Sequence, residues 1–463
     1  MPAAHATRFS EAEAALAETV RSRLRNGNSE VLRLLHPDGC EANLAPVAQA
    51  FNDATGMRVE LVKGSLEFIG SELRFNDVVK TSANAYDLAL PATYSLPDLV
   101  GEALLRDLSE FAREHEPPWL QEEMLYTLGD YFDGGFYGYQ TDGDAYLAFF
   151  NYALPGFKSE AARYADRYGI QLSAPKTWLE MDRQIRHFHK PDAGVYGGSL
   201  YRTNRYTGWE FWSRLHGKGV LPVSDDFVPQ FQSAAGVEAL QELIAVSTSL
   251  EPAASTNGLF DNFKSFAEGN KFVDLGWGGT QKFLQGETSR VRGNLAHGVL
   301  PGGVDSTGRA FAAPIFNWGW NFVVPVQSPN PELAYLFSLF ATLPTMSTLS
   351  VRQQGGYFDP HQRVHYTDST IADIYGHSFL TAHERSMSQC IPDFHVYVQE
   401  RYMRILGEAV HAATRGFLRP DIALREAANQ WERLTDDCGR EKQTQQWRQL
   451  KTSYPTRILE VAQ

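Results

Sequence analysis

Alternating strand and helix patterns over residues 30–90 constrain the fold more than any other feature of this sequence. The expected elements are, in order, a buried strand at 30–35, a helix capped by Asn43 and ended by Thr55 and Gly56, a strand at 57–62, a helix at 67–75 and a short buried strand at 87–90. Strand–helix–strand units of this kind build parallel sheets with helices on both faces. The first part of the chain is therefore predicted to be α/β.

Beyond residue 100 the pattern changes. The expected elements are a helical region at 100–135, strands at 136–139 and 146–150 around a turn at 141–144, a helix capped by Thr177, helices at 235–250 and 255–270, strands at 271–275 and 312–326, and a mostly helical last hundred residues. A chain of 463 residues is too long for one ordinary domain. Because no Gly/Ser-rich or Pro-rich linker divides it, we expect two lobes between which the chain crosses more than once.

Charge and hydropathy exclude two classes of function. The formal net charge is -13 and no run of Lys and Arg stands out, which argues against nucleic-acid binding because phosphate neutralisation needs a cationic face. No apolar stretch reaches the roughly 18 to 20 residues of a membrane span. No apolar segment of a secretory signal is visible near Met1. Instead, Ser10 and Glu13 resemble a capping box that opens an amphipathic helix over 10–26, with Gly27 as its stop.

The three cysteines, Cys40, Cys390 and Cys438, are far apart and form no CxxC motif. One disulfide with a thiol left over, or three unpaired thiols, both remain open. No residue set has metal-ligand spacing, and no GxSxG, P-loop, HExxH or GxGxxG motif occurs in a useful context. We therefore expect no metal, no cofactor and no enzyme activity.

Seven local patterns, in order over residues 30–430, resemble the family 1 extracellular solute-binding proteins, the maltose-binding-protein-like class. They are 48–56 (AQAFNDATG), 86–90 (YDLAL), 138–144 (GYQTDGD) followed by 149–151 (FFN), 175–180 (PKTWLE), 266–270 (FAEGN) leading to 275–279 (LGWGG), 300–303 (LPGG), and 391–392 (IP) with 409–413 (AVHAA) and 423–427 (ALREA). Three features depart from the family pattern: an extra helix before residue 29, a turn at 141–144 in place of the usual proline, and the missing export signal.

The resemblance implies a periplasmic-binding-protein-like type II fold, with two α/β lobes, crossing strands as the hinge and a helical C-terminal region. The expected boundaries are a helical extension at 1–28, a first lobe at 29–143 and 320–348, and a second lobe at 144–319 and 349–463. In such proteins a ligand in the cleft favours the closed form.

The function implied by the resemblance is that of the substrate-binding subunit of an ABC importer. It would capture a carbohydrate-like solute (a sugar, oligosaccharide, polyol or derivative) and deliver it to membrane permease subunits. The resemblance also implies a monomer in the periplasm or outside the cell, with no nucleic-acid partner.

Aromatic residues are the first candidates for the binding site, because rings stack on the C–H faces of sugars. Trp277 lies between Gly276 and the pair Gly278–Gly279, in a place where the family often has a stacking ring. Trp318 and Trp320 flank Gly319 and would point the same way in a strand, forming one wall of the site. Packing in the core is the competing interpretation for all three.

Polar candidates complete the predicted site. Asp142 and Asp144 could accept hydrogen bonds from vicinal hydroxyls, although Asp-Gly is also a common turn pair. The remaining candidates are Arg202, Tyr357, His395 and Tyr397, the first and the last two in segments that the family uses for ligands. Two alternatives stay open: a carbohydrate-active enzyme that uses Asp142 or Asp144 as acid or base, and a binder of an anion or metal chelate.

Overall fold

The computed structural model describes residues 3–25, 31–79 and 85–462 and divides the chain into two compact units. Unit 1 comprises Met1–Asp144 and Trp318–Gly376, and unit 2 comprises Ala145–Asn317 and His377–Gln463. The chain therefore passes from one unit to the other three times. Each unit is described by itself.

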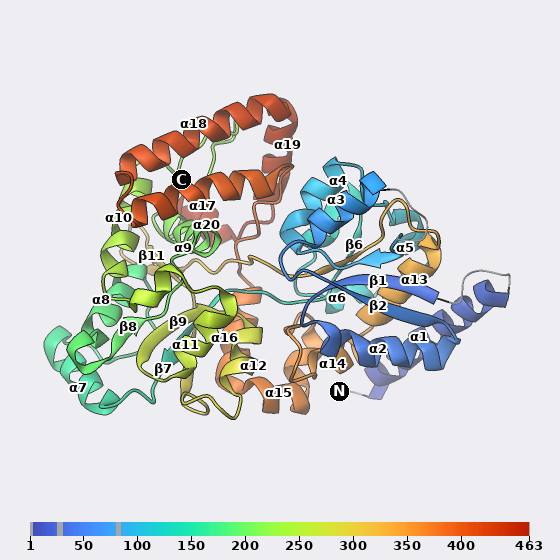
Figure 1. The fold of residues 1–463 in the computed structure, drawn as a ribbon, viewed down its shortest axis with the longest axis horizontal. Helices are drawn as coiled ribbons and strands as arrows, with labels where there is room; N and C mark the ends of the chain where they lie inside the picture. Colours follow the sequence, from blue (N-terminus) through green and yellow to red (C-terminus); the bar gives the residue numbers. More distant parts are fainter. Residues whose placement is uncertain (1–2, 26–30, 80–84, 463) are drawn as a thin grey trace. The chain divides into compact units, whose positions relative to one another are not determined.

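Unit 1 is a mixed sheet with helices on both faces (Figure 1). Its strands are β1 (Val31–Pro37), β2 (Arg58–Gly64), β3 (Leu88–Ala89), β4 (Tyr131–Phe132), β5 (Gly135–Phe136), β6 (Gly138–Gln140) and β13 (Asn321–Val323). Its helices are α1 (Ala3–Arg25), α2 (Glu41–Thr55), α3 (Ile69–Val79), η2 (Thr93–Ser95), α4 (Leu96–Gly101), α5 (Ser109–His115), α6 (Leu120–Glu123), η3 (Leu128–Asp130), α13 (Pro331–Thr342), α14 (Pro344–Val351), η6 (Arg363–Thr367) and α15 (Ser369–Tyr375).

The main sheet of unit 1 has the strand order β2-β1-β3-β13-β6. β1 is parallel to β2 and β3, whereas β13 is antiparallel to β3 and β6. Helices α3 and α4 lie on one face and α1 and α2 on the other (Figure 1). The core below the sheet is aromatic: the Phe51 ring of α2 makes edge contacts with Phe337 and Phe340 of α13 at centroid distances of 5.1 and 5.2 Å.

Unit 2 contains a second sheet and most of the helices of the C-terminal region. Its strands are β7 (Leu147–Asn151), β8 (Tyr196–Gly198), β9 (Lys271–Gly276), β10 (Leu295–Val299), β11 (Pro301–Val304) and β12 (Ala310–Ala312). Its helices are α7 (Phe157–Tyr168), α8 (Trp178–Phe188), η4 (Pro191–Ala193), α9 (Asn204–Gly217), α10 (Ala234–Ser247), η5 (Pro252–Ser255), α11 (Leu259–Ala267), α12 (Gly278–Leu284), α16 (His377–Met387), α17 (Gln399–Thr414), α18 (Pro420–Cys438), α19 (Arg440–Lys451) and α20 (Thr456–Val461).

The main sheet of unit 2 has the order β10-β7-β9-β8, with β8 parallel and β7 antiparallel to β9. β10 is antiparallel to β7, so β8, β9 and β10 run in one direction. Helices α17 and α18 pack together, and α17 also packs on α9 (Figure 1). Gly208 and Gly407 meet there: a Cβ added to Gly208 would lie 3.2 Å from the Cα of Gly407, a closeness that only small residues permit.

The strand–helix alternation predicted for residues 30–90 is confirmed, and so is the strand predicted at 271–275. Thr177 is confirmed as a helix cap, because its hydroxyl accepts a hydrogen bond from Glu180 N at 3.2 Å. The capping box at Ser10 is wrong, since α1 begins at Ala3, and the expected stop at Gly27 lies outside the described residues. The helical prediction for 100–135 is also wrong in part: short helices and the β4–β5 hairpin fill this region.

Residues 349–376 belong to unit 1, although the sequence placed them in the second lobe. Hydrogen bonds of Asn43, which was predicted to cap α2, hold part of this segment against unit 1. The cap position is Cys40, and the Asn43 side chain instead donates to Ser350 O at 2.8 Å and accepts from Tyr357 N at 2.8 Å. α1 likewise packs within unit 1, with Phe9 and Val20 buried and Arg23 paired with Glu332 at 2.7 Å.

Among the described residues no single helix has the length and apolarity of a membrane span; α13 and α14 together do, with a bend of 70° between them.

None of the three cysteines is in a disulfide within the described residues. Burial raises the pKa of the Cys390 thiol to about 12, so this thiol stays protonated at neutral pH.

Candidate ligand-binding site

Several of the predicted site residues follow the strands of the two main sheets. In unit 1 the carboxyl ends of β1, β3 and β6 lie at the same edge as the amino end of the antiparallel β13. In unit 2 the carboxyl ends of β8, β9 and β10 share an edge with the amino end of β7. Ligands of α/β proteins bind at the carboxyl ends of parallel strands. Both edges are therefore candidates for solute contact.

Three buried carboxylates meet at the edge of unit 1. Asp142 and Asp144, which follow β6, are joined by Asp359, and one oxygen of each lies within 4.8 Å of the others. Asp142 accepts from Asp359 N at 2.6 Å, and Asp144 accepts from Gly319 N at 2.9 Å. Carboxylate oxygens are acceptors that can bind sugar hydroxyls or a cation.

Tyr375 supports this carboxylate cluster as a neutral donor. Its hydroxyl lies 2.9 Å from Phe358 O and 3.1 Å from Asp359 Oδ1 and shares its one proton between these two acceptors. Burial, and then the neighbouring Asp359, Asp142 and Asp144 carboxylates, raise the pKa of Tyr375 well above its ordinary value. The phenol therefore keeps its proton and fixes the orientation of Asp359.

A buried polar network fixes the chain that carries Asp142. Asp130 Oδ1 accepts from Gln140 N at 2.7 Å and from Asn321 Nδ2 at 2.9 Å, which ties β6 to β13. Gln140 Nε2 in turn donates to Asp142 O at 2.6 Å. The Thr93 hydroxyl lies 2.7 Å from Asn321 Oδ1 and 3.0 Å from Gln140 Oε1 and shares its one proton between them, so a connected network orders the loop after β6.

The two predicted tryptophans lie beside the cluster in unit 1. The Trp318 and Trp320 rings are 5.9 Å apart, and Trp318 also contacts Tyr94 at 6.2 Å. The expected regular strand is wrong here, because β13 starts only at Asn321 and Gly319 has a φ of +65°. The left-handed glycine bends the chain between the rings. Both rings are buried, as they would also be in a packed core. Their contact with a ligand therefore stays a prediction.

Tyr357 lies at the same end of the unit, against the loop after β1. Its ring packs on Gly39, where an added Cβ would lie 2.1 Å from the ring. The side chain is half-buried, and burial raises the pKa of its phenol.

The edge of unit 2 carries an aromatic cluster around Trp277, which follows β9. The Trp277 ring contacts Tyr146, Tyr206 and Trp209 at centroid distances of 4.7, 6.3 and 6.0 Å. Tyr201 stacks on Tyr206 at 4.3 Å, which extends the cluster. Trp277 Nε1 donates to Asn317 Oδ1 at 2.9 Å, and this bond fixes the indole plane.

Arg202 has its partners inside unit 2. Its guanidinium donates to Glu210 at 2.7 Å, to Ser247 Oγ at 2.6 Å and to Tyr201 O at 2.7 Å. Glu210 also binds Arg214 at 2.9 Å, and Arg214 pairs with Asp182 at 2.7 Å. All four side chains are buried, so the network balances two cations with two anions. These contacts favour a structural role for Arg202.

His395 and Tyr397 lie in the segment between α16 and α17. The backbone of Tyr397 is held by Gln446 and Gln443 of α19, and Lys442 Nζ lies 6.0 Å from the centre of its ring. His395 is buried. Their contact with a ligand stays a prediction.

Sequence reasoning did not select Asp359, Tyr375 or the rings that surround Trp277. Asp359 is more than two hundred residues from Asp142, and no local pattern indicates that they meet. The helical spacing of Tyr206 and Trp209, three residues apart, was a usable signal, since such residues share one face of a helix.

The chain belongs to the family of bacterial extracellular solute-binding proteins: residues 44–346, more than half of its length, match the sequence model of that family. It has no match among curated protein sequences.

Solved structures with the same fold include ABC transporter solute-binding proteins from two genera. One, from Agrobacterium radiobacter K84 in complex with ribitol, has a TM-score of 0.72 and 16% identity, covering 87% of this chain and 98% of that one. Another, from Thermotoga lettingae with α-D-tagatose, has a TM-score of 0.70 and 18% identity, covering 88% and 99%. Maltose-bound MalE3 of T. maritima has a TM-score of 0.71 and 17% identity, covering 87% and 99%. At these identities the likeness establishes the fold.

Proposed function

We propose that this protein is the substrate-binding subunit of an ABC importer and that it captures a carbohydrate-like solute, such as a sugar, oligosaccharide or polyol. Membership of the solute-binding family supports the binding role. Similar structures hold ribitol, tagatose and maltose, which supports this class of solute. The single observation that carries the proposal is the buried cluster of Asp142, Asp144 and Asp359 in unit 1.

The chemistry of the two edges fits the two sides of a sugar. Hydroxyls need acceptors with fixed positions, and carboxylates held by backbone N–H groups and by Tyr375 are such acceptors. The C–H faces need flat apolar surfaces, as offered by Trp318 and Trp320 in unit 1 and by Trp277 in unit 2. The carboxylates in unit 1 and Trp277 in unit 2 are thus two candidate solute contacts, each within its own unit.

The surrounding roles follow from the same proposal. Tyr357, His395 and Tyr397 would add polar contacts, whereas Arg202 would hold the segment before α9 in place. The protein would work as a monomer in the periplasm or outside the cell and deliver its solute to membrane permease subunits. In this role the carboxylates bind hydroxyls and cleave no bond.

A thermal-shift screen against monosaccharides, disaccharides, polyols and sugar acids tests the proposal. A ligand at about 100 times its Kd stabilises the folded protein by about 2.7 kcal/mol, which raises Tm measurably. Asp142→Asn should abolish the shift, whereas Asp166→Asn, an exposed acid on α7, should preserve it. No shift with any compound would contradict the proposal. Turnover of a chromogenic glycoside that Asp144→Asn abolishes would establish the enzyme alternative instead.

A further inference from the structure

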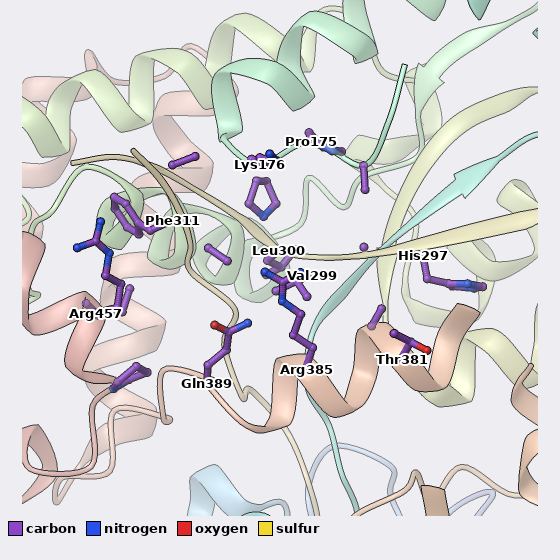
Figure 2. Close-up of a pocket in the computed structure, with 18 of the residues that line it drawn as sticks. Pro175, Lys176, His297, Val299, Leu300, Phe311, Thr381, Arg385, Gln389 and Arg457 are labelled. Carbon is purple, nitrogen blue, oxygen red and sulfur yellow. The ribbon is translucent and has the colours of Figure 1, made fainter. Parts of the chain in front are cut away.

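Unit 2 contains a cavity of about 810 Å³ that shares no residue with the aromatic cluster around Trp277 (Figure 2). It lies beside the edge strand β10, opens to solvent, and is lined by the β10–β11 segment, the β11–β12 turn, the loop before α8, and helices α16 and α20. Its volume is in the range of sites for small organic molecules, about 300–1,000 Å³.

The cavity is lined by cations on a chain whose net charge is -13. Lys176, Arg309 and Arg385 come from three separate elements, and none of them forms an ion pair within residues 3–25, 31–79 and 85–462. A fourth cation, Arg457 of α20, is already neutralised by Asp305 and by Glu460 at 3.2 Å. All three side chains are exposed, and a bound anion would offset the positive charge that they bring to the cavity.

A second polar group of the cavity is also without a partner. Gln389 Nε2 is buried and makes no hydrogen bond, and the side chain lies next to that of Arg385 in Figure 2. A buried donor without an acceptor costs free energy. An acceptor atom of a ligand placed beside Arg385 would satisfy this donor.

The rest of the lining defines the shape of the ligand. Val299, Leu300 and Phe311 give the cavity an apolar surface (Figure 2). His297 is hydrogen-bonded to Ser378 and Gln281 at 3.0 and 2.9 Å, and burial lowers its pKa to about 3. His297 is therefore neutral and leaves the charge of the site to Lys176, Arg309 and Arg385.

We propose that this cavity binds a small organic anion with at least two carboxylate or phosphate groups joined by an apolar body. Arg385 and Gln389 would hold one anionic group, because a guanidinium and an amide can donate to the same oxygen pair. Lys176 and Arg309 would hold the other group, and Phe311 would pack on the body between them. This anion site is separate from the proposed carbohydrate contacts, so either can exist without the other.

Isothermal titration calorimetry of the full chain at low salt tests the site, with citrate and pyrophosphate as probes. We expect saturable binding that weakens as salt is added, and a Kd raised about tenfold or more by Arg385→Gln and by Arg309→Gln. Arg425→Gln, which removes an exposed cation of α18 outside the cavity, is the matched control and should leave the Kd unchanged.

The comparison of probes identifies the anionic group, since binding of citrate alone selects carboxylates and binding of pyrophosphate alone selects phosphates. All three substitutions are at exposed positions, and circular dichroism with Tm confirms that each variant is folded. The site is refuted if neither probe binds saturably, or if Arg425→Gln weakens binding as much as Arg385→Gln, which would indicate general attraction to surface charge.

Discussion

The two units share a plan and differ in the charge that they place at the sheet edge. Each has a fully buried aspartate, Asp130 in unit 1 and Asp274 in unit 2, with one oxygen that accepts from a backbone N–H and from an asparagine amide. In unit 1 this acid supports a loop that carries two further carboxylates. In unit 2 the corresponding edge carries uncharged rings.

The two units also differ in how they neutralise the charged side chains near these edges. Unit 2 places Arg202 and Arg214 near its edge but neutralises both with Glu210 and Asp182. Unit 1 instead brings the three carboxylates Asp142, Asp144 and Asp359 together at its edge. We therefore propose that unit 1 accepts hydrogen bonds from the hydroxyls of a neutral ligand and that unit 2 offers it an apolar surface.

The largest effect is expected from a substitution that removes one of the two buried anions of unit 2. Glu210→Gln leaves two buried guanidinium groups facing one remaining carboxylate, and the free energy of unfolding should fall by about 3–5 kcal/mol. Urea denaturation followed by circular dichroism measures this. The control is Glu408→Gln in the exposed Arg404–Glu408 pair, for which a loss of about 0–1 kcal/mol is expected. Equal losses in the two variants would mean that the network contributes no more than a surface ion pair.

In unit 1 the close packing of Tyr357 on Gly39 should make stability sensitive to substitution of this glycine. Gly39 has a φ of +92° and the Tyr357 ring beside it, so Gly39→Ala combines backbone strain with a steric clash and should cost about 1–3 kcal/mol. Gly56→Ala is matched, because its φ is +80° and no atom lies within 4 Å of an added Cβ. It should cost about 1 kcal/mol. A smaller loss at Gly39 than at Gly56 would rule out the close packing of Tyr357.

The fold was more predictable than the site, and the two glycines illustrate why. The stop at Gly56 depends on local rules of helix ends, so the sequence alone predicted it. The contact of Gly39 with Tyr357 depends on the return of the chain to unit 1 after residue 317, which no local pattern encodes. Asp359 was missed as a site residue for the same reason. The pairing of Arg202 with Glu210 was not predicted either, because it forms only when the loop before α9 lies beside the helix.

The buried aspartates offer a smaller, pH-dependent test of the shared plan. Burial raises the pKa of Asp274 well above its ordinary value, so the folded state binds a proton that the unfolded chain releases near pH 4. The free energy of unfolding should therefore fall as pH rises above about 4, by at most about 1.4 kcal/mol per pH unit for this group. Asp274→Asn should remove that share of the decline, and Asp130→Asn should do the same in unit 1, where burial also raises the pKa.

Chemical denaturation at a series of pH values from 4 to 7 measures both effects. The natural chain should lose stability as pH rises, and each variant should lose less. The unfolding free energy of the variant minus that of the natural chain should therefore become more positive with pH. Parallel curves for Asp274→Asn and the natural chain would show that this carboxyl titrates alike in the folded and unfolded states.

The most direct test of the division between the units is calorimetric titration of the best solute from the screen into four chains: the natural protein, Asp142→Asn, Trp277→Leu and the double variant. Asp166→Asn serves as the control for charge. If the edge of unit 1 supplies acceptors and the edge of unit 2 an apolar surface, each single substitution should raise the Kd about tenfold or more, and Tm is measured for each chain. If the solute binds the natural protein tightly and neither substitution changes its Kd, the assignment of both edges is wrong.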